Sequence, residues 1–152
     1  MSPFNSFQFI QGLETLALRM ERHCQNTKAV ADFLSGHEKV ERVIYPGLME
    51  GEPKRRADTY LSGGYGALVG FELVKGAEAG KSFIEALELF YHVANIGDSR
   101  SLAIHPATTT HSQLSKEEQL KTGVTEGYVR LAVGIEHIDD ILEDLKNALD
   151  IV

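Results

Sequence analysis

The residues best suited to binding chemistry lie near the end of the chain, where apolar and polar side chains alternate. Val129, Leu131 and Val133 alternate with Arg130 and Ala132, a period of two that predicts a strand with one buried face. An arginine on the opposite face of a short, stiff strand can hold a carboxylate through two parallel hydrogen bonds, a geometry that lysine cannot copy. The spacing alone leaves a second interpretation open, in which Arg130 pairs with a neighbouring acid or lies on the surface.

Other residue types that often carry catalysis do not form a recognised pattern. The histidines His92, His105, His111 and His137 lack supporting cysteines or acids at metal-ligand spacing. No glycine-flanked serine indicates a nucleophile elbow, and residues 63–66 lack the strand and helix that flank a phosphate-binding loop. The sequence therefore predicts neither a metal site nor a serine nucleophile, and residues 63–66 are predicted as a turn.

The composition is typical of one globular domain. The chain has 152 residues, of which 43% are hydrophobic and 24% charged, and this suits a single domain with its own core rather than a disordered or membrane protein. The net charge of −7 argues against nucleic acid or an anionic membrane as a partner. Cys24 is the only cysteine, so no internal disulfide can form and we expect a reducing compartment, the cytoplasm.

The first third of the chain is predicted as one long helix that ends at Gly36. Phe4, Phe7 and Phe9 at its exposed beginning indicate that something else covers them. Cys24 lies in register with the apolar positions and is expected in the core. Steps of three and four residues define a single apolar stripe, made of Ile10, Leu13, Ala17, Met20, Cys24, Thr27, Ala31 and Leu34.

The remaining segments predict an α+β fold: a small, mostly antiparallel sheet with helices on one face. Arg130 would lie on the uncovered face, where we expect a ligand or a partner. The expected domains are a long inter-domain helix with its N-terminal lead, residues 1–36, and an α+β domain, residues 37–152. The patterns predict strands at 40–45, 67–73, 91–94 and 129–133, helices at 78–89, 115–121 and 138–152, and one helical turn near 55–61. Ser115 and Glu118 are predicted to form a capping box at the start of the 115–121 helix.

Short motifs are spread over nearly the whole chain. They are Ser2–Gln8, Gln11–Leu16, Arg19–Met20, Tyr45–Leu48, Asn95–Asp98, His105–His111 and Arg130–Glu136. Together and in this order they resemble the C-terminal part of the pyridoxal-phosphate (PLP) dependent enzymes of cysteine and methionine metabolism. The Pro-Phe-Asn-Ser-Phe opening, Asn95 and the Gly-Val-Thr run at 123–125 resemble the O-acetylhomoserine sulfhydrylase branch of that family.

The resemblance implies a fold type I PLP-dependent transferase, usually a homotetramer of active dimers, whose small C-terminal domain closes over the substrate. In the family, the arginine that matches Arg130 binds the α-carboxylate of the amino-acid substrate. Asn95 matches a serine that touches the same carboxylate in the lyase relatives, and an amide can do this through its NH2 group. An asparagine that only caps its strand is the alternative. Ala94 matches a position that is acidic in enzymes that handle cystathionine, so we expect a substrate without a distal ammonium.

The family's chemistry depends on an imine between the cofactor and a lysine that follows a Ser-x-Thr pattern. None of the lysines here has that context. Lys28 comes closest, after Gln25–Thr27, but it lies inside the first predicted helix. The resemblance therefore implies a C-terminal fragment, with PLP bound in the full-length enzyme by a missing PLP-binding domain. We expect no bound cofactor and no turnover for these residues alone.

Two classes of function follow. In the first, the chain is the substrate-closing part of an O-acetylhomoserine sulfhydrylase, which replaces acetate by sulfide to form homocysteine in methionine biosynthesis. A methionine γ-lyase or a cystathionine γ-synthase or lyase is the close variant. In the second, the chain is a free-standing, non-catalytic module that binds a protein through its uncovered sheet face and the Phe4 and Phe7 patch. An upstream reading frame with a Ser-x-Thr-Lys segment would favour the first.

Overall fold

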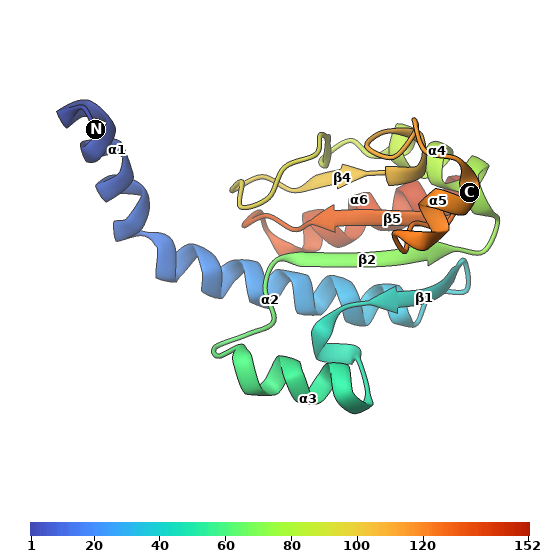
Figure 1. Cartoon of the computed structure of the whole chain (residues 1–152), viewed down its shortest axis with the longest axis horizontal. Helices are drawn as coiled ribbons and strands as arrows, with labels where there is room; N and C mark the ends of the chain where they lie inside the picture. The colour runs from blue at the N-terminus through green and yellow to red at the C-terminus, as the bar shows by residue number, and fades with distance from the viewer.

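The computed structural model describes all residues, 1–152, and has one five-stranded sheet in the order β1-β2-β5-β4-β3. Figure 1 shows β1, β2, β5 and β4 side by side in this order. The strands are β1 (Val40–Ile44), β2 (Leu68–Leu73), β3 (Tyr91–His92), β4 (Leu102–Ile104) and β5 (Tyr128–Ala132). The helices are α1 (Pro3–Glu14), α2 (Leu16–Ser35), α3 (Gly51–Tyr60), α4 (Gly76–Ala86), α5 (Lys116–Lys121) and α6 (Ile138–Ile151). Short 3-10 turns follow β1 (Pro46–Leu48) and β4 (Pro106–Thr108).

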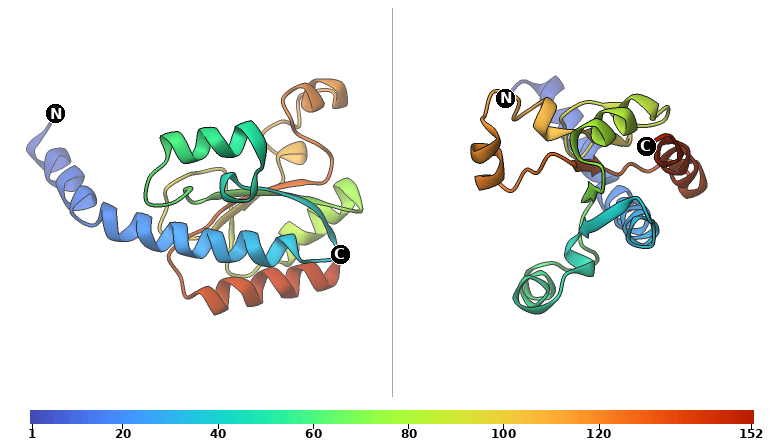
Figure 2. Two further views of the ribbon diagram at one scale, coloured as in Figure 1. Left: turned by 90° about the horizontal axis from the view of Figure 1, so that it is seen from below. Right: turned by 90° about the vertical axis from the view of Figure 1, so that its right-hand side faces the viewer.

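Helices α2, α4 and α6 cover one face of the sheet, whereas α3 and α5 lie on the other side of it, towards its margins (Figure 2). The core fills the space between the sheet and the three covering helices. Phe71 of β2 and Phe83 of α4 meet there edge to face, with ring centroids 5.4 Å apart. The predicted α+β class with a mostly antiparallel sheet is confirmed. None of the helices combines the length and the apolar character that a membrane span requires.

The pairing register decides which side chains of β5 face the core. All neighbouring strands pair antiparallel except β3 and β4, which are parallel. Val129 and Leu131 point into the core and are fully buried. Arg130 therefore points to the opposite face, where its cross-strand neighbours are Gly70 of β2 and Ile104 of β4. The strand predicted from the alternation is confirmed.

The prediction of one continuous N-terminal helix is wrong, because the helix breaks at Thr15. Thr15 has φ −103° and ψ 2°, outside the helical region, and the β-branched Thr15 and nearby Gly12 both lower helix propensity. Arg19 stabilises the break, since its side chain donates to the Gly12 carbonyl at 2.6 Å and to Thr15 Oγ1 at 3.3 Å. α1 buries none of its residues, so the apolar stripe of its half stays outside this core.

Cys24, predicted as a core residue, is only half-buried and faces Gly64 instead. The reason lies in how α2 is rotated. It presents the polar residues His23 and Asn26 to the sheet, and both are buried. Cys24 is therefore turned to the flank of the helix, and only the second half of α2 contributes an apolar surface to the core.

Two short elements differ from the predictions. α3 has ten residues instead of a single turn, because exposed pairs such as Glu52 with Arg55 and Arg56 support its otherwise polar surface. β4 had no predicted counterpart, since its three residues are all buried and show no alternation. By contrast, the capping box of α5 is present, with Ser115 and Glu118 bonding each other's backbone N–H.

His105 lies buried against α4, where a Cβ added to Gly80 would meet its ring at 2.5–2.6 Å. Its Nδ1 lies 2.9 Å from Thr108 Oγ1, and its Nε2 lies 2.7 Å from the backbone oxygen of Glu126. A carbonyl can only accept, so Nε2 carries the hydrogen and Nδ1 accepts from the hydroxyl. Burial lowers the pKa of His105, against the opposing effect of the Glu126 carbonyl, and the positive charge of Lys81 lowers it further.

The depressed pKa of His105 predicts a loss of stability in mild acid. As the pH falls, His105 takes up its proton first in the unfolded chain, near the ordinary histidine pKa of about 6.5. The contribution of neutral His105 to the free energy of unfolding should therefore be complete above that pH. It should decrease as the pH falls towards the lower pKa of the folded state. Urea unfolding of the wild type and of His105→Gln at pH 7.5 and pH 5.5 measures this. The variant should lose less stability between the two pH values, and an equal loss in both proteins would contradict the assignment.

Candidate functional site

The uncovered face of the sheet carries an open groove of about 460 Å³. β2 and β5 form its floor, the turn after β1 and the residues before β2 form one wall, and the loop after β3 forms the other. Among the lining residues are His23, Pro46, Tyr65, Gly70, Ile96, Tyr128 and Arg130. Segments that are far apart in sequence thus meet around the arginine that the sequence singled out.

The guanidinium of Arg130 has no acidic partner. None of the ion pairs of the chain includes it. Its Nε is buried without a hydrogen-bond partner, and its Nη2 donates only to the backbone oxygen of Asn95 at 3.5 Å, the weak limit of a hydrogen bond. An unpaired buried N–H costs about 1–3 kcal/mol. The folded chain therefore carries an arginine that lacks an acceptor, and a bound carboxylate would supply one.

The acidic side chain that β2 places on this face is already engaged. Glu72 of β2 is buried, and its carboxylate accepts from Arg42 Nη2 at 2.7 Å and from Thr125 Oγ1 at 2.8 Å. Burial by itself would raise the pKa of Glu72, but these bonds and the charge of Arg42 outweigh it, so that the pKa is lowered. Glu72 thus stays ionised and satisfied beside the groove, and it leaves Arg130 free.

Tyr128 lies over Gly70 on the floor of the groove. A Cβ on Gly70 would stand 2.5–2.8 Å from the tyrosine ring, closer than any side chain tolerates, so this strand position requires glycine. Burial raises the pKa of the Tyr128 hydroxyl, while the positive charge of Arg130 acts to lower it. The hydroxyl therefore remains protonated near neutral pH and can donate a hydrogen bond beside Arg130.

We expect Gly70→Ala to destabilise the chain by about 1–3 kcal/mol, because the new methyl group must displace the Tyr128 ring. Urea unfolding measures the change. Gly12→Ala is the matched control, since no atom lies within 4 Å of the added Cβ in α1, and there alanine should be neutral or stabilising. Removing the ring in Gly70→Ala/Tyr128→Ala should recover part of the loss. Strict additivity of the two changes would speak against the clash.

The loop after β3 brings Asn95 to Arg130, through a backbone oxygen. Residues 93–100 are exposed and form no regular structure, and Ile96 and Gly97 of this loop line the groove. The strand predicted over 91–94 ends at His92, so Ala94 is an exposed loop residue outside the groove lining. The roles of the Asn95 amide and of Ala94 towards a substrate stay predictions.

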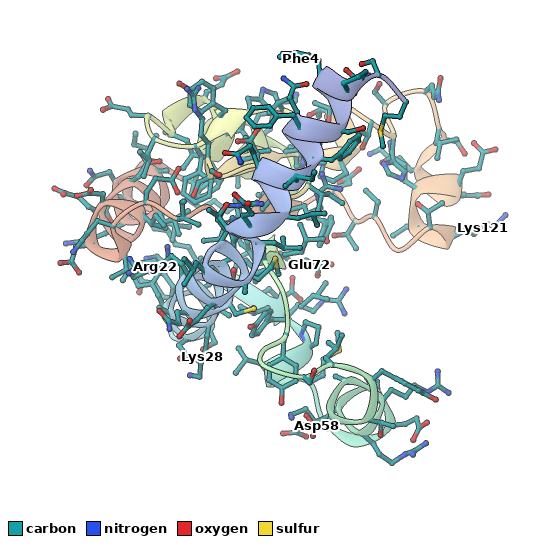
Figure 3. The ribbon with its side chains drawn as sticks, turned by 90° about the vertical axis from the view of Figure 1, so that its left-hand side faces the viewer. Phe4, Arg22, Lys28, Asp58, Glu72 and Lys121 are labelled. Carbon is teal, nitrogen blue, oxygen red and sulfur yellow. The ribbon has the colours of Figure 1, made fainter.

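The wall residue Tyr65 was missed by the sequence analysis, which predicted only a turn there. Its hydroxyl donates to Asp58 Oδ1 at 2.6 Å and accepts from Lys54 Nζ at 2.7 Å. Both partners lie on α3, and Figure 3 shows Asp58 there, well away from Glu72 in the sheet. Tyr45 meets the same ring edge to face, with centroids 6.1 Å apart. α3 thus holds one side of the groove. A single tyrosine between glycines gives no signal for this role.

The residues of the groove do not fit the anchoring of PLP on their own. No lysine lines the groove, and an imine to the cofactor requires one. Lys28, the closest match to the family pattern, is exposed on the outside of α2 and pairs with Asp32 (Figure 3). The groove can bind and orient an anionic group, and it has no residue for covalent attachment of the cofactor.

Comparison with known proteins identifies the family of the chain. The profile of the Cys/Met metabolism PLP-dependent enzymes matches residues 1–150. An O-acetyl-L-homoserine sulfhydrylase of Leptospira meyeri is 57% identical over 98% of this chain and 34% of its own length. An L-methionine gamma-lyase of Fusobacterium nucleatum subsp. polymorphum is 43% identical over 99% of this chain and 38% of its own length.

A solved structure has the same fold. The crystal structure of a putative O-acetylhomoserine (thiol)-lyase from Campylobacter jejuni, with a pyridoxyl-lysine monophosphate at position 205, matches 99% of this chain and 36% of that chain. The TM-score is 0.88 and the sequence identity 42%. This chain thus spans about a third of the length of its relatives. With the profile matched over nearly all its residues, it belongs to the family of Cys/Met metabolism PLP-dependent enzymes.

Proposed function

We propose that the chain is the C-terminal, substrate-closing part of a PLP-dependent O-acetylhomoserine sulfhydrylase. The whole enzyme would replace the acetate of O-acetylhomoserine by sulfide and release homocysteine. PLP would be held by a lysine outside these residues. Within this part, Arg130 binds the α-carboxylate of the substrate, and the Asn95 amide contacts the same carboxylate. The observation that carries the proposal is the unpaired Arg130 guanidinium at the groove.

The branch of the family is inferred from two features. The relative with 57% identity is a sulfhydrylase, and the γ-lyase relative is less similar, at 43%. Ala94 offers no acid to a distal ammonium, which suits an acetyl ester and sulfide. Methionine γ-lyase activity is the second candidate, because its substrate also has an uncharged distal end and requires the same carboxylate site.

The exposed apolar side chains near the N-terminus support a partner inside the same enzyme. Phe4, Phe7 and Phe9 of α1 are 58–66% exposed, and α1 extends away from the sheet (Figures 1 and 3). Single exposed apolar residues are common, but a helix with this many needs a cover. The proposed cover is the PLP-binding domain, in an enzyme that assembles as a homotetramer.

Kinetics on the complete enzyme tests the activity. Purified protein is assayed with O-acetyl-L-homoserine and sulfide for homocysteine, and in parallel with L-methionine for methanethiol. The sulfhydrylase assignment expects a clearly higher kcat/KM for the first reaction. Preference for methionine would select the γ-lyase, and no activity with either substrate would reject both. Residues 1–152 alone, mixed with PLP, should develop no imine absorbance band.

A further inference from the structure

The corner that joins β5 to α6, residues 133–136, is bonded to two other segments, the residue before β2 and the residues that lead into β4. The Val133 N–H donates to the Ala67 carbonyl before β2 at 2.8 Å, and the Ile135 N–H donates to the Ser99 carbonyl at 2.9 Å. The Gly134 N–H donates to Ser101 Oγ at 2.9 Å. Val133 and Gly134 are buried, so their backbone N–H groups need partners within the chain.

Glu136 links this corner to the loop that carries Asn95. Its carboxylate accepts from the Ser101 backbone N–H at 2.6 Å and from Ser101 Oγ at 2.9 Å. Ser101 is fully buried and lies at the end of the otherwise exposed 93–100 loop. Gly134 makes room for the contact, since a Cβ there would stand 2.5 Å from the Ser101 nitrogen. Glu136 is thus the one charged side chain among the groups that fix the return end of the loop, beside the Ile135 and Gly134 N–H groups.

α2 holds the corner from the other side. Asn26 Nδ2 donates to the carbonyls of Gly134 and Glu136, both at 3.0 Å. His23 Nδ1 lies 2.6 Å from the Val133 carbonyl, so this nitrogen carries a hydrogen. His23 and Asn26 are both buried. The corner at residues 133–136 is therefore held between α2 on one side and the residues that lead into β4 on the other.

We infer that Glu136 is a positioning residue that sets the distance between Arg130 and the Asn95 loop. This inference rests on the proposed function, in which both groups meet one carboxylate. Arg130 is held by β5, whose pairing with β2 and β4 is regular. The Asn95 loop has no such pairing, and its bond to Arg130 is long. Glu136, through Ser101, is the side chain that joins the end of the loop to the corner following Arg130.

The test is a double-mutant cycle in the complete enzyme with O-acetyl-L-homoserine and sulfide. Glu136→Gln keeps the side chain's shape but removes its charge, so the bond from the Ser101 N–H becomes a weaker neutral one and Ser101 Oγ must accept from the new NH2 group instead of donating. A small displacement of a binding group costs about ten- to a hundredfold, and we expect KM to rise about tenfold with kcat changed far less. In an Arg130→Lys background, Glu136→Gln should add less than twofold, because both changes act on one contact.

Glu143→Gln is the matched control, an exposed glutamate on α6, and should leave KM unchanged. If Arg130→Lys itself leaves KM unchanged, the proposed function fails, whatever Glu136 does. If Arg130→Lys raises KM but Glu136→Gln has no effect, or the two effects multiply, only the positioning role is overturned. Should Glu136→Gln fail to fold, Ser101→Ala replaces it, since the backbone bond to Glu136 survives there. If neither variant folds, the contact supports folding only and the inference is rejected.

Discussion

Replacing Asp144 by alanine is expected to lower the free energy of unfolding by about 3 kcal/mol. Asp144 lies on α6 and is buried. Its carboxylate accepts three successive backbone N–H groups, those of Glu88 at 2.8 Å, Leu89 at 3.1 Å and Phe90 at 3.2 Å. No lysine or arginine shares the carboxylate, so these amides are its only partners in the chain.

The size of the effect follows from what alanine leaves behind. Hydrogen bonds to a charged acceptor contribute about 1.5–3 kcal/mol each, and a buried donor left unpaired costs about 1–3 kcal/mol. An open groove beside Asp144 and Glu88 lets water satisfy part of the exposed amides, so each of the three unpaired donors costs about 1 kcal/mol, the lower end of its range, and the total is about 3 kcal/mol. The affected segment leads into β3 and so into the Asn95 loop.

Thermal and urea unfolding of Asp144→Ala measures the loss. For a chain of this size, about 3 kcal/mol corresponds to a Tm lower by roughly 6–12 °C. Asp144→Asn retains one acceptor oxygen and should fall between the wild type and alanine. Glu143→Ala, the exposed neighbour on the same helix, should change Tm by no more than about 1–2 °C. A Tm for Asp144→Ala within that margin would show that the three bonds carry no net stability.

The sequence predicted those parts of the fold whose periodicity is local. The alternation around Arg130 placed the strand and its buried face correctly, because a one-residue change of register would reverse every side chain. The capping box of Ser115 and Glu118 was equally readable, since both of its residues lie within one turn. The same alternation placed Arg130 on the uncovered face, whereas its binding role was inferred from the family resemblance and stays a prediction, and its freedom from acids required the structure.

Features that depend on contacts between residues far apart in the sequence could not be predicted from the sequence. The break at Thr15 depends on the Arg19 side chain, which satisfies the opened turn. Asn26 and His23 lie outside the apolar stripe of the first predicted helix, and only their bonds to the corner at 133–136 explain why they are buried. The sequence did not predict that Tyr65 and Tyr128 line the groove, since neither residue belongs to a motif or a periodic pattern that indicates this position. Each of these depends on a pairing across the fold that no local period records.

The second large effect is expected at Arg130 itself. Arg130→Met should abolish binding of the amino-acid carboxylate while leaving the fold intact. Losing a bidentate, charge-assisted pair costs about 3–5 kcal/mol, which corresponds to a rise of about a hundred- to a thousandfold in substrate Kd or more. Arg130→Lys retains the charge without the planar fork and should fall in between.

Stability should move in the opposite direction to binding, and this makes the prediction specific. Arg130 makes one long hydrogen bond and leaves its buried Nε unpaired, so its removal relieves a cost that folding otherwise carries. Methionine fills a similar volume without a polar atom that needs a partner. We therefore expect the Tm of residues 1–152 to stay constant or rise in Arg130→Met, as happens when binding residues are replaced in other sites.

Substrate binding to the complete enzyme and Tm are measured on the same set of variants. Arg42→Met is the control on the same sheet face. Arg42 pairs with the buried Glu72, so its removal should lower stability and leave substrate Kd unchanged, the reverse of Arg130→Met. An ester of 3-aminopropanol, which lacks the carboxylate, should bind weakly and equally to the wild type and to Arg130→Met. If Arg130→Met keeps the wild-type Kd, or unfolds at a clearly lower temperature, Arg130 is a structural residue and the carboxylate site lies elsewhere.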